Sequence, residues 1–166
     1  MFVSHNNFIY ADTGLILFEV DNTTLTHNHV INNNFGVYFQ RSESNDYHNN
    51  SMQTNGDYGL ALDGDSHYNT IHHNAFLDNG GAASQAKDDG NENIWYEVQT
   101  SEGNYWNDWG GTGIYEIDGL GGNDDLYPLN IIPVISEIIK GNTTLQLLLV
   151  IPSLSVIFVL FQRKKK

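Results

Sequence analysis

Short apolar and polar segments recur at a nearly fixed interval along the first half of the chain. Gly14, Gly36, Gly59 and Gly81 open successive copies, which are 22, 23 and 22 residues apart. After the first three glycines, apolar residues alternate with other residues, as they do on a strand with one buried face. The alternating pairs are Leu15 and Leu17, Val37 and Phe39, and Leu60 and Leu62. A period of this length indicates a stacked-repeat architecture.

Asparagines recur at two positions of the same repeat. Short strands with no helical period predict an all-β protein, a right-handed single-stranded parallel β-helix of about four rungs. We place one extra residue of the third copy in the turn Asp63 to Ser66. Stacked amides can bond from rung to rung, so we expect structural ladders. The ladder positions are Asn28, Asn50 and Asn74, and Asn33, Asn55 and Asn79.

The chain begins inside a rung, with Phe2, Phe8 and Ile9 as expected core residues. Residues 1–7 contain no basic segment of the kind that starts an export signal. A β-solenoid normally covers the open strand edges of its first rung with a cap, and none is visible in the sequence. We therefore expect this sequence to be the C-terminal part of a longer protein.

Three large aromatic residues, Tyr105, Trp106 and Trp109, fall within five positions after the repeats. One interpretation is a lid that covers the last rung with aromatic side chains. The alternative is a platform on which sugar rings stack. The sequence favours the lid and leaves glycan stacking on these three residues open.

The repeats and two closing motifs, Gly103-Asn104-Tyr105-Trp106 and Asp125-Leu126-Tyr127-Pro128-Leu129, resemble the NosD-like right-handed parallel β-helix proteins. The resemblance covers about residues 1 to 130, and Ile117-Asp118-Gly119 belongs to it. It implies a pectate-lyase-like fold whose repeats are associated with carbohydrate-binding proteins and sugar hydrolases, commonly on archaeal cell surfaces. It also implies copper handling, for which the chain offers no cysteine and only Met1 and Met52 as thioether ligands. The segment Gly110 to Tyr115 contains no acid, so we expect no calcium there.

The last part of the chain has the composition of a membrane anchor. Leu145 to Phe161 is almost entirely apolar, and the basic residues Arg163 to Lys166 follow it. This pattern predicts a C-terminal transmembrane helix with a cytoplasmic basic tail and the β-helix outside the cell. The expected organisation is rungs at 1–103, a cap at 104–129, a stalk at 130–144 and the membrane helix with its tail at 145–166.

Several histidines share positions in the repeat. His5, His27 and His73 lie just before a ladder asparagine, with Asn49 in the remaining rung, and His48 and His72 share the neighbouring position. Stacked imidazoles about 5 Å apart can bind a transition metal. The alternative is that these positions simply face solvent. We therefore treat His5, His27 and His73 as weak metal candidates and expect no bound cofactor.

The acidic residues do not single out a catalytic pair. Asp63 and Asp65 share a turn and Asp57 and Asp78 flank other rungs, but no basic column accompanies them, and the sequence favours a non-catalytic protein.

The net charge of −13 argues against nucleic acid as a partner. We expect a membrane-anchored surface module that contacts glycans or other cell-surface proteins. The alternatives are a carbohydrate-active lyase or hydrolase, and metal handling of the NosD kind.

Overall fold

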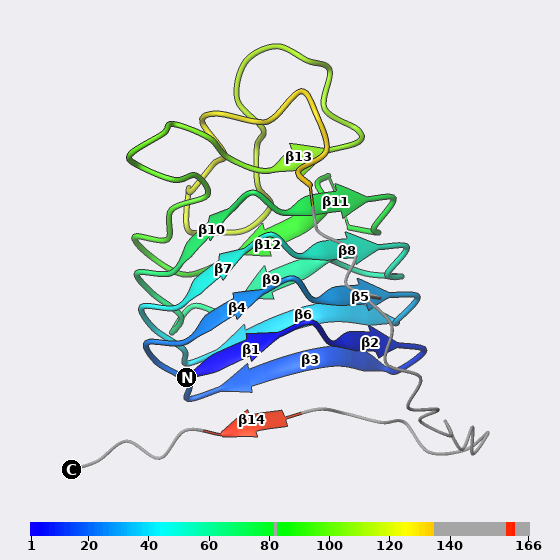
Figure 1. Ribbon diagram of the computed structural model, residues 1–166. Helices are drawn as coiled ribbons and strands as arrows, with labels where there is room; N and C mark the ends of the chain where they lie inside the picture. Colours follow the sequence, from blue (N-terminus) through cyan, green and yellow to red (C-terminus); the bar gives the residue numbers. More distant parts are fainter. Residues whose placement is uncertain (82, 135–158, 162–166) are drawn as a thin grey trace.

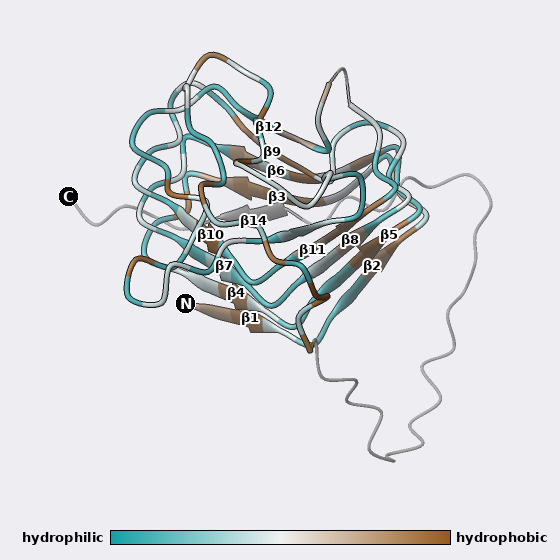
Figure 2. Cartoon of the chain, turned by 90° about the horizontal axis from the view of Figure 1, so that it is seen from above, coloured by the Kyte–Doolittle hydropathy of each residue, from teal (hydrophilic) through white to brown (hydrophobic). Residues whose placement is uncertain are grey.

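The chain coils into a parallel β-solenoid of about four turns, as the repeat predicts (Figure 1). The structure is a computed structural model, and it describes residues 1–81, 83–134 and 159–161. Each full turn contributes one strand to each of three sheets, which surround a common interior when seen from above (Figure 2). The strands pair in parallel along each sheet.

The three sheets are named A, B and C. Sheet A contains β1 (Phe2–Ser4), β4 (Thr24–Thr26), β7 (Asp46–His48) and β10 (Thr70–His72). Sheet B contains β2 (Asn7–Ile9), β5 (His29–Ile31), β8 (Ser51–Gln53), β11 (Ala75–Leu77) and β13 (Tyr105–Trp106). Sheet C contains β3 (Thr13–Phe18), β6 (Phe35–Gln40), β9 (Leu60–Leu62), β12 (Ala86–Asp88) and β14 (Val159–Phe161).

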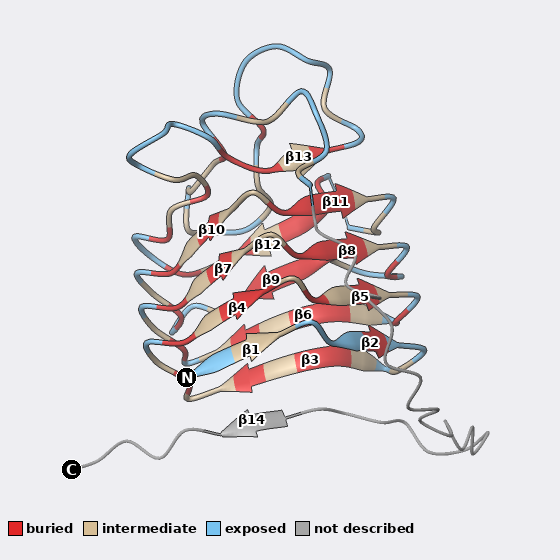
Figure 3. Cartoon of the chain, viewed as in Figure 1, coloured by how far each residue is buried: buried red, intermediate tan, exposed pale blue. Residues whose placement is uncertain are grey.

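The core is a column of apolar side chains inside the coil, and buried residues recur along the stacked strands (Figure 3). Leu17 aligns with Phe39, and Phe39 aligns with Leu62, each at most 1% exposed. The predicted inward stack is therefore confirmed. In the first rung only Phe8 is buried, whereas Phe2 and Ile9 are exposed. Neighbouring residues of a strand face opposite sides, so a buried Phe8 places Ile9 outside.

The six asparagines expected to stack lie in two hydrogen-bonded columns. Asn28 donates from its backbone nitrogen and from Nδ2 to Oδ1 of Asn50, at 2.9 and 3.0 Å. The second column repeats this arrangement between Asn33 and Asn55, at 3.1 and 3.0 Å. Each amide thus satisfies backbone and side-chain groups of a neighbouring rung at the corner of the coil, where the strand ladders are interrupted.

The glycine column is shorter than predicted. Gly14, Gly36 and Gly59 are in register, and a Cβ on Gly36 would collide with the Gly59 carbonyl oxygen. The prediction that Gly81 opens the fourth copy is wrong. Gln85 occupies that position instead: its carbonyl accepts from the Gly59 nitrogen at 2.9 Å, and its side chain ends the second asparagine column. Extra residues before Gln85 shift the register, which a fixed period cannot anticipate.

The extra residue of the third copy lies where the sequence places it. Phe39 aligns with Leu62, 23 positions later, whereas the next asparagine column joins Asn45 to Asn69, 24 positions later. The added residue therefore falls in the turn that contains Asp63 to Ser66.

The chain after β13 folds over the last rung. Trp106 is 2% exposed and stacks on Phe76 and on Tyr115, with ring centroids 4.0 Å apart in both pairs. The fully buried carboxylate of Asp125 accepts a hydrogen bond from the Trp106 indole at 2.9 Å. It also accepts one from the backbone nitrogen of Tyr127 at 3.1 Å. Asp125 therefore joins the two closing motifs of the sequence.

The predicted membrane helix, Leu145 to Phe161, lies outside the described residues except at its end. Val159–Phe161 form β14, which pairs in parallel with β3, so the prediction of a helix is wrong for these three residues. The edge of β3 offers unpaired backbone groups to such a strand. Within residues 1–81, 83–134 and 159–161 there is no helix of the length and apolarity that a membrane span requires. Most of the expected stalk, 130–144, also lies outside the described part.

Candidate metal centre

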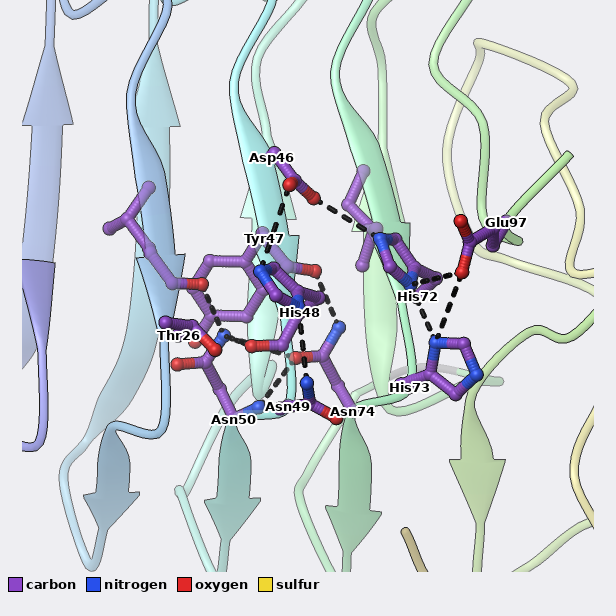
Figure 4. A network of polar contacts seen from close by, with 12 residues as sticks. Thr26, Asp46, Tyr47, His48, Asn49, Asn50, His72, His73, Asn74 and Glu97 are labelled. Carbon is purple, nitrogen blue, oxygen red and sulfur yellow. Dashed lines mark hydrogen bonds and ion pairs between the residues drawn. The ribbon is translucent and has the colours of Figure 1, made fainter. Parts of the chain in front are cut away.

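The corner between sheets A and B brings consecutive side chains together. Adjacent residues of a strand point to opposite faces, and His72 is the last residue of β10. His73 has a left-handed backbone, with φ of 53°, and so turns the chain at this corner. As a result the Nδ1 atoms of His72 and His73 lie 2.6 Å apart (Figure 4).

A short loop next to this corner adds two carboxylates. The backbone nitrogen of Glu97 donates to the carbonyl of Glu102 at 2.8 Å, so the two residues lie side by side. Oε2 of Glu97 is 3.9 Å from Nδ1 of His72 and 4.0 Å from Nδ1 of His73. Within the described chain, His72, His73 and Glu97 form a group whose ligand atoms all lie within 4.8 Å of one another.

Two further carboxylates set the orientation of the imidazoles. Nε2 of His72 lies 3.2 Å from Asp46 Oδ1, and Nε2 of His73 lies 2.9 Å from Glu102 Oε2. An ionised carboxylate only accepts hydrogen bonds, so each Nε2 carries the proton. In the neutral rings both Nδ1 atoms then carry lone pairs, and these converge. A proton or a metal ion between the two nitrogens would satisfy both lone pairs.

The charges around this corner favour the ionised carboxylates. Burial opposes ionisation of Asp46, but the hydrogen bond from His72 and the nearby His48 outweigh it, and the pKa of Asp46 is lowered. The hydrogen bond from His73 likewise lowers the pKa of Glu102. Burial lowers the pKa of His48, which favours its neutral, metal-binding form. These conditions keep the carboxylates available as hydrogen-bond acceptors.

The structure divides the three histidines that the sequence proposes as metal candidates. His5 and His27 stack with ring centroids 5.0 Å apart and an interplanar angle of 7°. In this repeat column Asn49 lies between His27 and His73, so His73 does not continue the stack. His73 lies beside His72 instead. Stacked rings direct their in-plane lone pairs alongside each other, so the His5–His27 pair does not converge on one point. The convergent group is the adjacent pair His72 and His73.

Sequence reasoning did not find the carboxylates of this group. Asp46 aligns with Thr70, the first residue of β10, and Thr70 lies two positions before His72. The repeat register could therefore have indicated that Asp46 lies near His72. Glu97 and Glu102 lie after the last regular repeat, in a loop whose path no periodicity describes.

The aromatic residues proposed for glycan stacking lie in the cap. Trp106 cannot present a face to a sugar, because both of its faces are covered by other rings. Trp109 is partly buried and packs against the core. Tyr105 is half-buried at the end of sheet B.

Comparison with known proteins identifies the family. A family model described as periplasmic copper-binding protein (NosD) matches residues 2–111, which is well over half of the chain. The chain belongs to the NosD family. Searches among curated proteins and among solved structures found no match.

The NosD family description names copper, so we compare the possible metal ligands at this corner with the ligand preferences of copper(I) and copper(II). Soft thiolate and thioether ligands select copper(I), whereas imidazole and carboxylate suit copper(II). The chain has no cysteine, and the sulfur of the buried Met52 accepts from the Tyr47 hydroxyl at 3.1 Å. His72, His73 and Glu97 therefore fit copper(II), and nothing comparable in the described part of the chain fits copper(I).

Proposed function

We propose that this NosD-family protein binds a divalent transition metal ion, copper(II) by its donor set, at Nδ1 of His72, Nδ1 of His73 and the Glu97 carboxylate. The observation that carries the proposal is the position of the two Nδ1 atoms, 2.6 Å apart and beside a carboxylate. Copper is described for the family. In this chain the ligands are two adjacent histidines at a solenoid corner.

The separation of the two nitrogens favours one coordination geometry. Two nitrogens about 2.0 Å from one ion are about 2.8 Å apart when their bonds meet at a right angle, and about 3.3 Å apart at the tetrahedral angle. The observed 2.6 Å is closer to the right angle. Square-planar or tetragonal sites with nitrogen and oxygen ligands are typical of copper(II). Glu97 is partly exposed and needs to move by about 1 Å to complete the site.

Metal titration of the full chain tests this function. Copper(II) binding, followed by calorimetry and by electron paramagnetic resonance, is expected for the wild type and lost in His72→Ala and in His73→Ala. Glu102→Gln should weaken binding by about 10- to 100-fold, because Glu102 orients a ligand without being one.

His5→Ala is the matched control, since it removes an exposed imidazole of the same column. Wild-type protein that binds no copper(II), or variants at His72 and His73 that bind it as tightly as His5→Ala, would contradict the proposal.

The family description places NosD proteins in the periplasm, and we propose the same side of the membrane for this β-helix. Anchoring by Leu145 to Phe161 stays a prediction, and it competes with the pairing of Val159–Phe161 to β3. Cell fractionation distinguishes the two. An anchored protein sediments with membranes and is released by deletion of residues 145–166, whereas a protein found in the soluble fraction with its tail intact contradicts the anchor.

Contact with glycans or other surface proteins also stays a prediction. We leave it outside the proposed function because Trp106, the central residue of the expected stacking platform, is only 2% exposed.

A further inference from the structure

The carboxylate of Glu97 approaches the two histidines from a short hairpin, residues 97–102. The backbone nitrogen of Glu97 donates to the carbonyl of Glu102 at 2.8 Å, and the nitrogen of Ser101 donates to the carbonyl of Glu97 at 2.9 Å. Glu102 also contacts Nε2 of His73 at 2.9 Å. The hairpin thus carries one proposed metal ligand and one residue that orients a second. Figure 4 shows the Glu97 side chain beside both imidazoles.

Both ends of this hairpin contact the second closing motif, Asp125 to Leu129. Before the hairpin, the ring of Tyr96 packs edge-on against the ring of Tyr127, with centroids 4.9 Å apart and an interplanar angle of 78°. After it, the backbone nitrogen of Gly103 donates to the carbonyl of Tyr127 at 2.8 Å. The carbonyl of Gly103 accepts from the backbone nitrogen of His73 at 2.7 Å. Tyr127 therefore holds the two ends of the hairpin, next to the corner that carries the histidines.

We propose that the second closing motif sets the copper(II) affinity of the site, with Tyr127 as a positioning residue for Glu97. Tyr127 acts through Tyr96 and Gly103, which flank the hairpin. This inference rests on the proposed function, because it concerns the same ion. A coupling between two equilibria acts equally in both directions. An ion bonded to the histidines and to Glu97 therefore holds the cap on the last rung in return.

The physical reason is the order of the hairpin before the ion arrives. Oε2 of Glu97 lies 3.9 Å from Nδ1 of His72, so a small movement brings the carboxylate to an ion at that nitrogen. A hairpin that is held at both ends loses little conformational freedom on binding, whereas a loosened one must be ordered at a cost in affinity. Loss of one edge-to-face aromatic pair corresponds to a change of up to about tenfold in an equilibrium constant.

Copper(II) titration of full-length variants at Tyr127, followed by calorimetry, tests the coupling. Tyr127→Ala is expected to bind copper(II) about 5- to 10-fold more weakly than the wild type. Tyr127→Phe keeps the ring and should bind like the wild type. The Tyr127 side chain is 43% exposed, so neither replacement opens a cavity in the core. Leu126→Ala is the matched control, because Leu126 is 45% exposed in the same motif.

Hydrogen exchange followed by mass spectrometry is the second readout. Copper(II) should slow the exchange of the backbone amides of residues 96–104 and 125–129 in the wild type. The effect there should exceed the effect on residues 7–18 of the first rung. A smaller difference is expected in Tyr127→Ala, because the ion then has less hold on the cap.

The possible outcomes separate this inference from the proposed function. Copper(II) bound equally tightly by the wild type and Tyr127→Ala overturns the coupling and leaves the metal site. Tyr127→Phe or Leu126→Ala as weak as Tyr127→Ala also overturns it, because the ring contact with Tyr96 would then not be the cause. No copper-dependent slowing at residues 125–129 overturns it as well. No binding by the wild type overturns both proposals.

Discussion

Replacement of Asn50 with alanine is expected to lower the free energy of unfolding by about 4 kcal/mol. Asn50 is fully buried, and its Oδ1 accepts from the backbone and side-chain nitrogens of Asn28. Its Nδ2 donates to the carbonyls of Leu25 and His48, both at 2.9 Å. The variant removes these four hydrogen bonds, each with a net contribution of about 1 kcal/mol. Urea denaturation measures the loss.

Asn7→Ala is the matched control for the ladder. Asn7 lies on the edge strand β2, and its side chain is exposed. We expect a change within about 0.5 kcal/mol, as for other surface substitutions. A loss at Asn50 no larger than the loss at Asn7 would contradict the view that the asparagine columns hold the rungs together.

Replacement of Asp125 with alanine is expected to have a similar effect, again about 4 kcal/mol, and to loosen the cap. The Asp125 carboxylate is fully buried and accepts from the backbone of Asn104 at 2.7 Å, from the Trp106 indole at 2.9 Å and from the backbone of Tyr127 at 3.1 Å. The variant leaves all three donors unsatisfied. Denaturation followed by tryptophan fluorescence measures both the stability and the exposure of Trp106.

The neighbouring Asp124 provides the control for the cap. Its carboxylate is partly exposed and accepts from the Ile117 nitrogen at 3.2 Å, so Asp124→Ala should cost about 1 kcal/mol. If both variants unfold alike, with Trp106 still buried, Asp125 does not join the two closing motifs.

The stability that Asp125 contributes is expected to depend on pH, because its carboxyl group titrates. Burial raises the pKa of the Asp125 carboxyl, although the hydrogen bonds from Trp106 and Asn104 oppose the shift. The folded protein therefore holds this proton more tightly than the unfolded chain, and the stability contributed by Asp125 falls as the pH rises through the folded pKa. The stability of the wild type relative to Asp125→Asn should decrease over the same range. An increase would contradict the raised pKa.

The sequence predicts the regular part of this fold because every rung buries apolar side chains at the same positions of the repeat. Leu17, Phe39 and Leu62 pack in one interior. A Cβ on Gly14 or on Gly36 would meet the carbonyl oxygen of the glycine in the next rung. The prediction fails where the period breaks. Gln85 replaces a glycine after an insertion, and β14 pairs with an edge that no repeat position specifies.

The candidate site, too, could be predicted only where its residues belong to the repeat. The repeat places His72 and His73 in defined columns, but strand alternation alone would separate their side chains. Their convergence depends on the left-handed backbone at His73, a property of the corner. Glu97 and Glu102 are brought there by a loop outside the repeat, so the sequence could indicate the histidines and not the complete ligand set.

Anomalous diffraction from crystals of the protein grown with copper(II) locates any copper ion bound between His72 and His73. We expect an anomalous copper peak within bonding distance of both Nδ1 atoms, about 2.0 Å from each. Copper peaks found only elsewhere, or His72 and His73 rings that share a proton with no copper between them, would contradict it.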